Sequence, residues 1–143
     1  MQDKLLVYGS LMSTIESSIA KLLRANATFL GEARVRGYLF DLGSYPGLKI
    51  DYDSDVLVKG HLFQMHNPEY LLAVLDEYEG AANPQVENEY VREESQIDFK
   101  GENITCWTYL YNLETDGLPK IESGDYLEFL SNNPDYQKFI ASV

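Results

Sequence analysis

The sequence has one cysteine and two histidines, and this scarcity excludes several kinds of site. A single cysteine, Cys106, cannot form a disulfide within the chain, and there is no C-x-x-C metal-binding motif. The histidines, His61 and His66, are five positions apart and would point to opposite faces of a continuous strand. Neither lies in a metal-ligand motif, so we predict no metal site.

Long apolar runs are also absent. No stretch approaches the roughly 20 apolar residues that cross a membrane as a helix. The first ten residues, MQDKLLVYGS, lack the basic region and apolar run of a secretory signal. Together with the single cysteine, these features lead us to expect a protein of the reducing cytoplasm with no membrane partner.

Basic residues are few: 11 lysines and arginines stand against 23 acidic residues, for a net charge of −12. A field of this sign repels nucleic-acid phosphates and anionic lipids. We therefore expect no nucleic-acid partner, and a small molecule or another protein fits better.

Familiar nucleophile and phosphate motifs are missing as well. The chain has neither a G-x-S-x-G elbow nor a G-x-x-x-x-G-K-[ST] loop. Ser10 follows Gly9 at an expected strand end, where its role can be backbone presentation alone. Cys106 lies within an alternating apolar stretch, which favours a buried core cysteine over a nucleophile.

What the sequence does contain fits one α+β domain over residues 1–143. Hydrophobic residues make up 45% of the chain, and there are 11 tyrosines, which suit strands and pocket walls.

The expected strands are 4–8, 28–42, 56–65, 90–99 and 104–113. The expected helices are 14–24, opened by a capping box at 13–16, and 68–79, capped by Asn67, with weaker helical patches at 126–130 and 134–140. Gly31 and Gly37 are expected at bulges or bends of the second strand. Periodicity alone does not decide whether the sheet closes into a barrel.

Carboxylates are the remaining candidates for chemistry. Glu77 and Glu79 lie near the end of the expected helix 68–79, where acidic side chains oppose the helix dipole. One interpretation is a solvated acidic face. The other is that one carboxylate turns inward, where burial raises its pKa and lets it exchange protons near neutral pH.

Six short segments occur in order along the chain: 7–11 (VYGSL), 45–47 (YPG), 60–63 (GHLF), 75–80 (LDEYEG), 90–92 (YVR) and 106–109 (CWTY). Together they resemble the gamma-glutamylcyclotransferase-like family. The resemblance spans residues 5–111, and residues 114–143 carry little of it. It implies a small mixed β-barrel flanked by helices, with a pocket at one end. It also implies release of 5-oxoproline from a γ-glutamyl amine or peptide, without a metal or organic cofactor.

The resemblance assigns the acid/base role to the position of Glu79. It implies that Gly9, Ser10 and Leu11 bind substrate through backbone N–H groups. Tyr8, Tyr90 and Tyr109 are expected to line the γ-glutamyl pocket, and for Tyr90 and Tyr109 an ordinary role in the sheet stays an equal alternative.

Two departures affect the substrate. Leu11 stands where the glutathione-cycle branch tends to have Asn, which shifts the resemblance toward the gamma-glutamylamine branch. The segment 81–89 is longer than expected before the next strand.

Two alternative functions stay open: a non-catalytic binding module on the same fold, and a hydrolase using Glu77 and Glu79 together. The latter is disfavoured because residues two apart on a helix diverge by about 200°. The oligomeric state and leaving amine stay undetermined.

Overall fold

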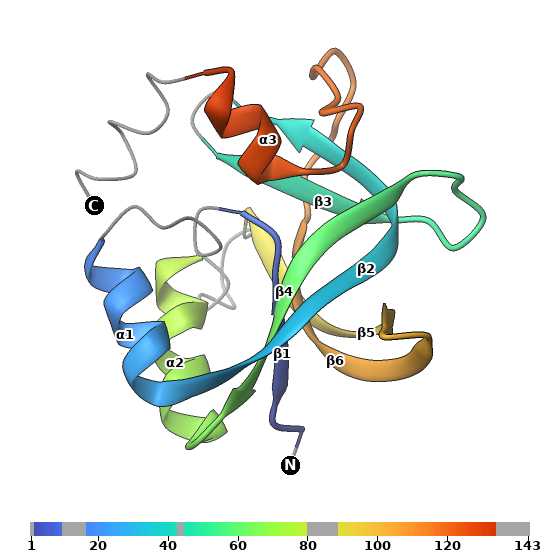
Figure 1. Cartoon of the computed structure of the whole chain (residues 1–143). Helices are drawn as coiled ribbons and strands as arrows, with labels where there is room; N and C mark the ends of the chain where they lie inside the picture. Colours follow the sequence, from blue (N-terminus) through green and yellow to red (C-terminus); the bar gives the residue numbers. More distant parts are fainter. Residues whose placement is uncertain (1, 10–16, 43–44, 80–88, 134–143) are drawn as a thin grey trace.

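The computed structural model describes residues 2–9, 17–42, 45–79 and 89–133. None of the helices in these ranges is long and apolar enough to cross a membrane. The chain forms strands and helices in the following order (Figure 1): β1 (Lys4–Val7), α1 (Ser18–Asn26), β2 (Ala27–Asp41), β3 (Pro46–Ile50), β4 (Leu57–Met65), α2 (Pro68–Tyr78), β5 (Tyr90–Phe99), β6 (Glu102–Tyr111) and α3 (Tyr126–Ser131).

Five of the strands close into a mixed barrel. Their order is β2–β4–β1–β6–β5, and β5 returns to β2 where Asp98 pairs with Arg34. The β1–β6 pairing is parallel and the other pairings are antiparallel, while β3 extends the sheet beyond β2. The expected small mixed β-barrel with flanking helices is therefore confirmed.

The strand β1 is buried on both of its faces. Leu5, Leu6 and Val7 are 0%, 1% and 6% exposed, so consecutive side chains are covered although they point in opposite directions. The helices α1 and α2, which Figure 1 shows on the same side of the barrel, add buried apolar residues to this core at helical spacing. These residues are Ile19, Ala20 and Leu23 of α1 and Leu71, Leu72 and Leu75 of α2.

The helix caps explain where α1 and α2 begin. α2 begins as predicted, because the Asn67 side chain accepts a hydrogen bond from the Tyr70 N–H at 3.4 Å. The predicted start of α1 at residue 14 is wrong. Ser17 has extended backbone angles and its Oγ accepts from the Ala20 N–H at 3.2 Å, so the helix begins at Ser18. The expected capping box at 13–16 lies outside the described residues.

The hairpin between β5 and β6 turns more tightly than the sequence indicated. Lys100 and Gly101 have φ values of 53° and 84°, which matches a two-residue hairpin turn. Phe99 pairs with Glu102, so β6 begins at Glu102 and not at Ile104.

The two glycines of β2 serve different purposes. Gly31 has φ 146° and lies at a shift of register with β4, which confirms the predicted bulge. Gly37 lies within regular pairing to β3, so of the bulge or bend expected there, no bulge is present. A Cβ on Gly37 would come within 2.2 Å of the Lys49 carbonyl oxygen, so glycine is needed because two backbones approach closely.

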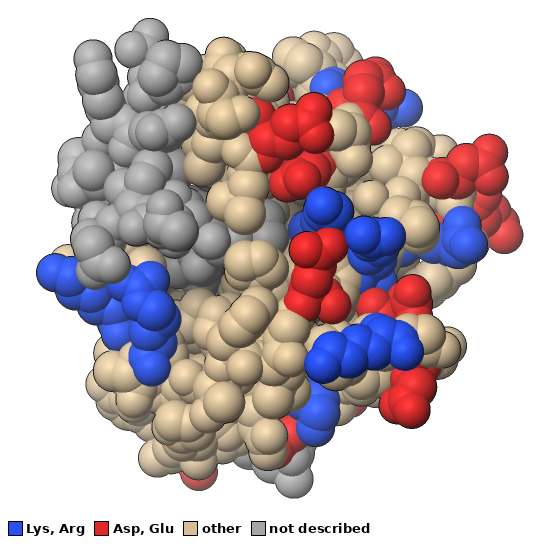
Figure 2. Space-filling view, viewed as in Figure 1, with Lys and Arg blue, Asp and Glu red and all other residues tan. Residues whose placement is uncertain are grey.

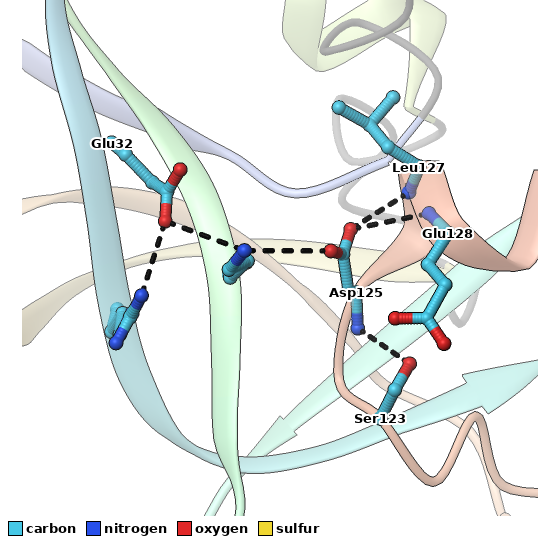
Figure 3. A network of polar contacts seen from close by, with 7 residues as sticks. Glu32, Ser123, Asp125, Leu127 and Glu128 are labelled. Carbon is cyan, nitrogen blue, oxygen red and sulfur yellow. Dashed lines mark hydrogen bonds and ion pairs between the residues drawn. The ribbon is translucent and has the colours of Figure 1, made fainter.

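The helix α3 is tied to the barrel by a polar network (Figure 3). Asp125 caps α3 by accepting from the N–H groups of Leu127 and Glu128, at 3.1 Å and 3.3 Å. Lys59 of β4 lies 3.6 Å both from Asp125 and from Glu32 of β2. α3 confirms the helical patch predicted at 126–130, and the patch predicted at 134–140 lies outside the described residues. Figure 2 shows acidic and basic side chains interspersed over the right-hand part of this face.

We expect Gly37→Ala to destabilise the protein by about 2–3 kcal/mol, because the added methyl group must push β3 away from β2. Gly101→Ala is the control: no atom lies within 4 Å of its Cβ, so it bears only the cost of a positive φ, about 1 kcal/mol. Urea denaturation of both variants measures the difference. Equal losses of stability would contradict the close approach at Gly37.

Candidate active site

Glu79 lies at the C-terminal end of α2, where it is the C-cap residue. Its N–H donates to the Leu75 carbonyl oxygen at 2.8 Å, which continues the helix hydrogen bonding to this residue. The last turn of α2 has no basic residue that would offset an acid at the negative end of the helix dipole. Glu79 therefore occupies a position that is unfavourable for a merely structural carboxylate.

The surroundings of Glu79 favour its protonated form. Burial, and to a smaller extent the charge of Glu89, raises the pKa of the Glu79 carboxyl to about 7. Such a group is populated both with and without its proton near neutral pH, as an acid/base catalyst requires. This fits the inward-turned carboxylate of the two interpretations of the acidic helix end.

Burial raises the pKa values of the Tyr8 and Tyr90 phenols, and the charge of nearby Glu79 adds to both shifts. The Tyr8 hydroxyl donates to the Tyr109 carbonyl oxygen at 2.5 Å and accepts from the Leu48 N–H at 3.3 Å. Both phenols therefore stay protonated, and the hydrogen of Tyr8 is already donated to the backbone.

The Tyr90 hydroxyl is held in the same way. It donates to the Pro46 carbonyl oxygen at 2.6 Å. A phenol whose hydrogen is committed to a carbonyl offers a ligand only its oxygen lone pairs. Toward any further partner Tyr8 and Tyr90 can therefore act only as hydrogen-bond acceptors, and the Tyr8 oxygen already accepts from Leu48.

Tyr109 has a different partner. It is buried, and its hydroxyl donates to Asp76 Oδ1 at 2.6 Å. Arg92 also binds Asp76, with two hydrogen bonds of 2.7 Å and 3.0 Å, and its guanidinium lies 4.3 Å from the centre of the Trp107 ring. The sequence pointed to Tyr109 but not to Asp76, whose only signal was its place one helical turn before Glu79.

A second acid and more aromatic rings lie beside Tyr90. Glu89 accepts a hydrogen bond from Tyr45, and this bond raises the pKa of the Tyr45 phenol to about 12. The rings of Tyr45 and Tyr111 lie 6.4 Å and 5.7 Å from the Tyr90 ring. The sequence motifs assigned neither Tyr45 nor Glu89 a role in the site, because their contact joins distant segments.

Gly9 follows Tyr8 and lies against β3. A Cβ at this position would come within 2.9 Å of Pro46 Cγ, so a larger residue would displace the proline whose carbonyl oxygen binds Tyr90. Ser10 and Leu11, the other predicted loop residues, lie outside the described residues.

The remaining candidates lie elsewhere or are inert. Cys106 is fully buried and its pKa is raised to about 11 by burial, which confirms it as a core residue. Glu77 is exposed, whereas Glu79 is partly buried, so the two acids do not share one environment. Within the described ranges, no three His, Cys, Asp or Glu side chains are grouped as metal ligands would be.

Comparison with known proteins connects this geometry to a family. The model of the gamma-glutamyl cyclotransferase, AIG2-like family matches residues 5–128. The chain belongs to this family. The family resemblance noted in the sequence motifs is thereby confirmed.

Individual members of the AIG2-like family support the assignment. The gamma-glutamylcyclotransferase family protein YtfP of Escherichia coli is 32% identical over 126 residues, which cover 87% of this chain and 96% of YtfP. The solution structure of YtfP matches with a TM-score of 0.62, over 88% of this chain and 97% of that one.

Two more distant structures share the fold. YkqA of Bacillus subtilis matches with a TM-score of 0.70 and 23% identity; the match covers 94% of this chain but 43% of YkqA. An AIG2-like protein of Mus musculus matches with a TM-score of 0.62 and 20% identity, over 85% of this chain and 87% of that one.

We expect Glu79→Gln to stabilise the protein at alkaline pH. In the native chain the folded-state pKa of about 7 exceeds the ordinary value of 4.5, so the folded state loses stability as pH rises between these values. The variant has no carboxyl to ionise at this position and does not lose this stability. Its free energy of unfolding should exceed that of the native chain by about 2–3 kcal/mol at pH 8 and equal it below pH 4.5.

Urea denaturation at several pH values measures this gain. Glu77→Gln is the matched control: it removes the same charge from the exposed side of the helix end and should change stability little at any pH. A pH-independent effect of Glu79→Gln would contradict the buried carboxyl.

We further expect Glu89→Gln to lower the pKa of Glu79 by about half a unit to one unit, because it removes a like charge but keeps an oxygen that accepts from Tyr45. Carbon-13 NMR titration of the Glu79 carboxyl measures this shift, with Glu93→Gln on the exposed side of β5 as control. An unchanged or raised pKa would show that Glu89 does not act on Glu79.

Proposed function

We propose that this protein releases 5-oxoproline and a free amine from a γ-glutamyl amine or peptide, with Glu79 as general acid/base. The observation that carries the proposal is the Glu79 carboxyl, whose pKa of about 7 suits proton exchange at neutral pH and which lies beside tyrosines held as hydrogen-bond acceptors. Membership of the AIG2-like cyclotransferase family supports the reaction class.

The proposed reaction needs one group that first takes and then returns a proton. The substrate's α-ammonium has no lone pair, so the Glu79 carboxylate accepts its proton. The free amine attacks the γ-carbonyl carbon, a carbon–nitrogen bond forms and the five-membered ring closes. The original amide bond then breaks as the protonated Glu79 gives its proton to the departing nitrogen, while the ring nitrogen loses its second proton to solvent and becomes the lactam N–H. No cofactor takes part in these steps.

The neighbouring residues are proposed to orient the γ-glutamyl group. The oxygens of Tyr8 and Tyr90 accept hydrogen bonds from the α-ammonium, which brings it toward Glu79. Backbone N–H groups at Gly9, Ser10 and Leu11 bind the substrate carboxylate or the developing oxyanion. Tyr109 contributes the face of its ring, because its hydroxyl is engaged by Asp76.

The leaving amine is the less constrained part of the proposal. Leu11 favours a γ-glutamyl amine, as in the gamma-glutamylamine branch, over glutathione as the substrate. A small-molecule substrate agrees with the net charge of −12, and a cytoplasmic enzyme would meet such metabolites in solution.

The test is 5-oxoproline release measured by mass spectrometry with γ-glutamyl dipeptides, ε-(γ-glutamyl)lysine, γ-glutamyl polyamines and glutathione. We expect native protein to release the lactam from at least one of them, with an acidic limb of kcat/KM near pH 7. Glu79→Gln should lose roughly 10²-fold or more of this activity, because it cannot exchange the proton.

Glu77→Gln is the control for charge and helix stability, and should keep native activity. A folded native protein that binds γ-glutamyl compounds without releasing 5-oxoproline would instead support a binding module. Full activity of Glu79→Gln would assign the proton transfer to another group.

A further inference from the structure

Asp76 is the meeting point of three structural elements near Glu79. It lies in the last turn of α2 and accepts two hydrogen bonds from Arg92 of β5, at 2.7 Å and 3.0 Å. It also accepts from the Tyr109 hydroxyl of β6 at 2.6 Å. A carboxylate bound by two nitrogens of a guanidinium and by a phenol is strongly fixed in direction as well as position.

The two donors to Asp76 are themselves held in place. Arg92 and Tyr109 are directly paired residues of the β5–β6 ladder, so their side chains leave the same face of the sheet side by side. Arg92 stacks on Trp107, two residues before Tyr109. The carbonyl oxygen of Tyr109 receives the Tyr8 hydroxyl, so Tyr109 joins the Asp76 network to the end of β1.

Helix geometry extends this fixation to Glu79. Residues three apart on a helix lie on the same face, one turn apart, and the Glu79 N–H still bonds to the carbonyl oxygen of Leu75. We propose that Asp76, Arg92 and Tyr109 are positioning residues that bind the last turn of α2 to β5 and β6, hold the Glu79 carboxyl beside Tyr8, and balance the charge next to it. This inference rests on the proposed acid/base role of Glu79.

The charge balance is a separate property of the same contacts. The groups that act on or face Glu79 from the surrounding elements are Glu89, Tyr8, Tyr90 and Tyr109, with Tyr45 bonded to Glu89. The charges of Asp76, Arg92 and Glu79 all act on the pKa of the Tyr109 phenol, so these three groups lie close enough to interact electrostatically. Within it, Arg92 cancels the charge of Asp76, so loss of either partner leaves an unbalanced charge near Glu79.

Single substitutions should therefore shift the titration of Glu79 in opposite directions. Arg92→Met leaves the Asp76 carboxylate alone, and the pKa of Glu79 should rise by about half a unit. Asp76→Asn leaves the guanidinium alone, and the pKa should fall by about half a unit. The double variant should return close to the native value. Carbon-13 NMR of the Glu79 carboxyl, assigned by its disappearance in Glu79→Gln, measures all three without any turnover.

The positioning role has its own measurement. Hydrogen exchange of the Glu79 amide should become about tenfold faster in Arg92→Met and in Tyr109→Phe, because the last turn of α2 loses its anchors. Arg34→Met is the matched control, since Arg34 is an exposed residue of β2 paired with Glu32, and it should change neither exchange nor titration.

Shifts of the Glu79 pKa in the same direction in both single variants, or native exchange in Arg92→Met, would overturn the proposal. Circular dichroism confirms that each variant is folded, and Arg92→Lys, which keeps the charge but not the paired hydrogen bonds, should keep the native pKa while exchange rises. Because no readout uses substrate, these results stand whether or not 5-oxoproline is released.

Discussion

The position of β1 between β4 and β6 is the constraint on which the barrel and the candidate site both depend. Its side chains are buried on both faces, and it makes the parallel pairing that gives the barrel its mixed character. The strand ends at Val7, so Tyr8 leaves it still buried, with its hydroxyl between the backbones of β6 and β3. A buried phenol needs such partners, since leaving its hydroxyl unsatisfied would cost about 1–3 kcal/mol.

Backbone carbonyls hold the tyrosines of the site more rigidly than side-chain partners would. Tyr8 uses the carbonyl of Tyr109, and Tyr90 uses that of Pro46, which connects β5 to β3. Both carbonyls belong to paired strands, so their positions are set by the ladders. The close approach of Gly9 to Pro46 belongs to the same arrangement. The phenolic oxygens are thus fixed by the barrel itself, as preorganisation of a binding site requires.

Local sequence patterns predicted much of this structure, and the failures follow from contacts that such patterns do not encode. Alternation and the Asn67 cap predicted five of the strands and α2 closely, but β3 (Pro46–Ile50) was missed. Closure of the barrel depends on the pairing of Arg34 with Asp98, 64 positions apart, and no local pattern contains that information. The start of α1 was misplaced because both Ser13 and Ser17 are acceptable caps by sequence alone.

Some residues of the candidate site were likewise predicted from local sequence motifs, and others were found only in the structure. Tyr8, Gly9 and Glu79 belong to motifs read directly from the chain, and the choice of Glu79 over Glu77 came from the family resemblance. The structure adds a physical difference between the two, since Glu77 is exposed. Asp76 and Glu89 were missed because their partners, Arg92 and Tyr45, come from other segments and became visible only once the barrel brought these together.

Asp76 and Glu79 lie one turn apart at the end of α2, but only Asp76 has an oppositely charged partner among the described residues. This contrast is the strongest physical argument for a function at the helix end. Asp76 is given a guanidinium and a phenol, which satisfy its charge. Glu79 is largely buried and lies near a second acid, Glu89, and both features disfavour its charged form.

A fold selected for stability alone would pair both carboxylates or replace Glu79 with a neutral side chain, because a buried unpaired charge costs several kcal/mol. Different environments for neighbouring acids allow one of them to exchange protons at pH 7 while the other serves as a structural partner. The stable Asp76 ion pair anchors the helix end, so Glu79 can lack an ion-pair partner among the described residues without the last turn of α2 moving toward solvent.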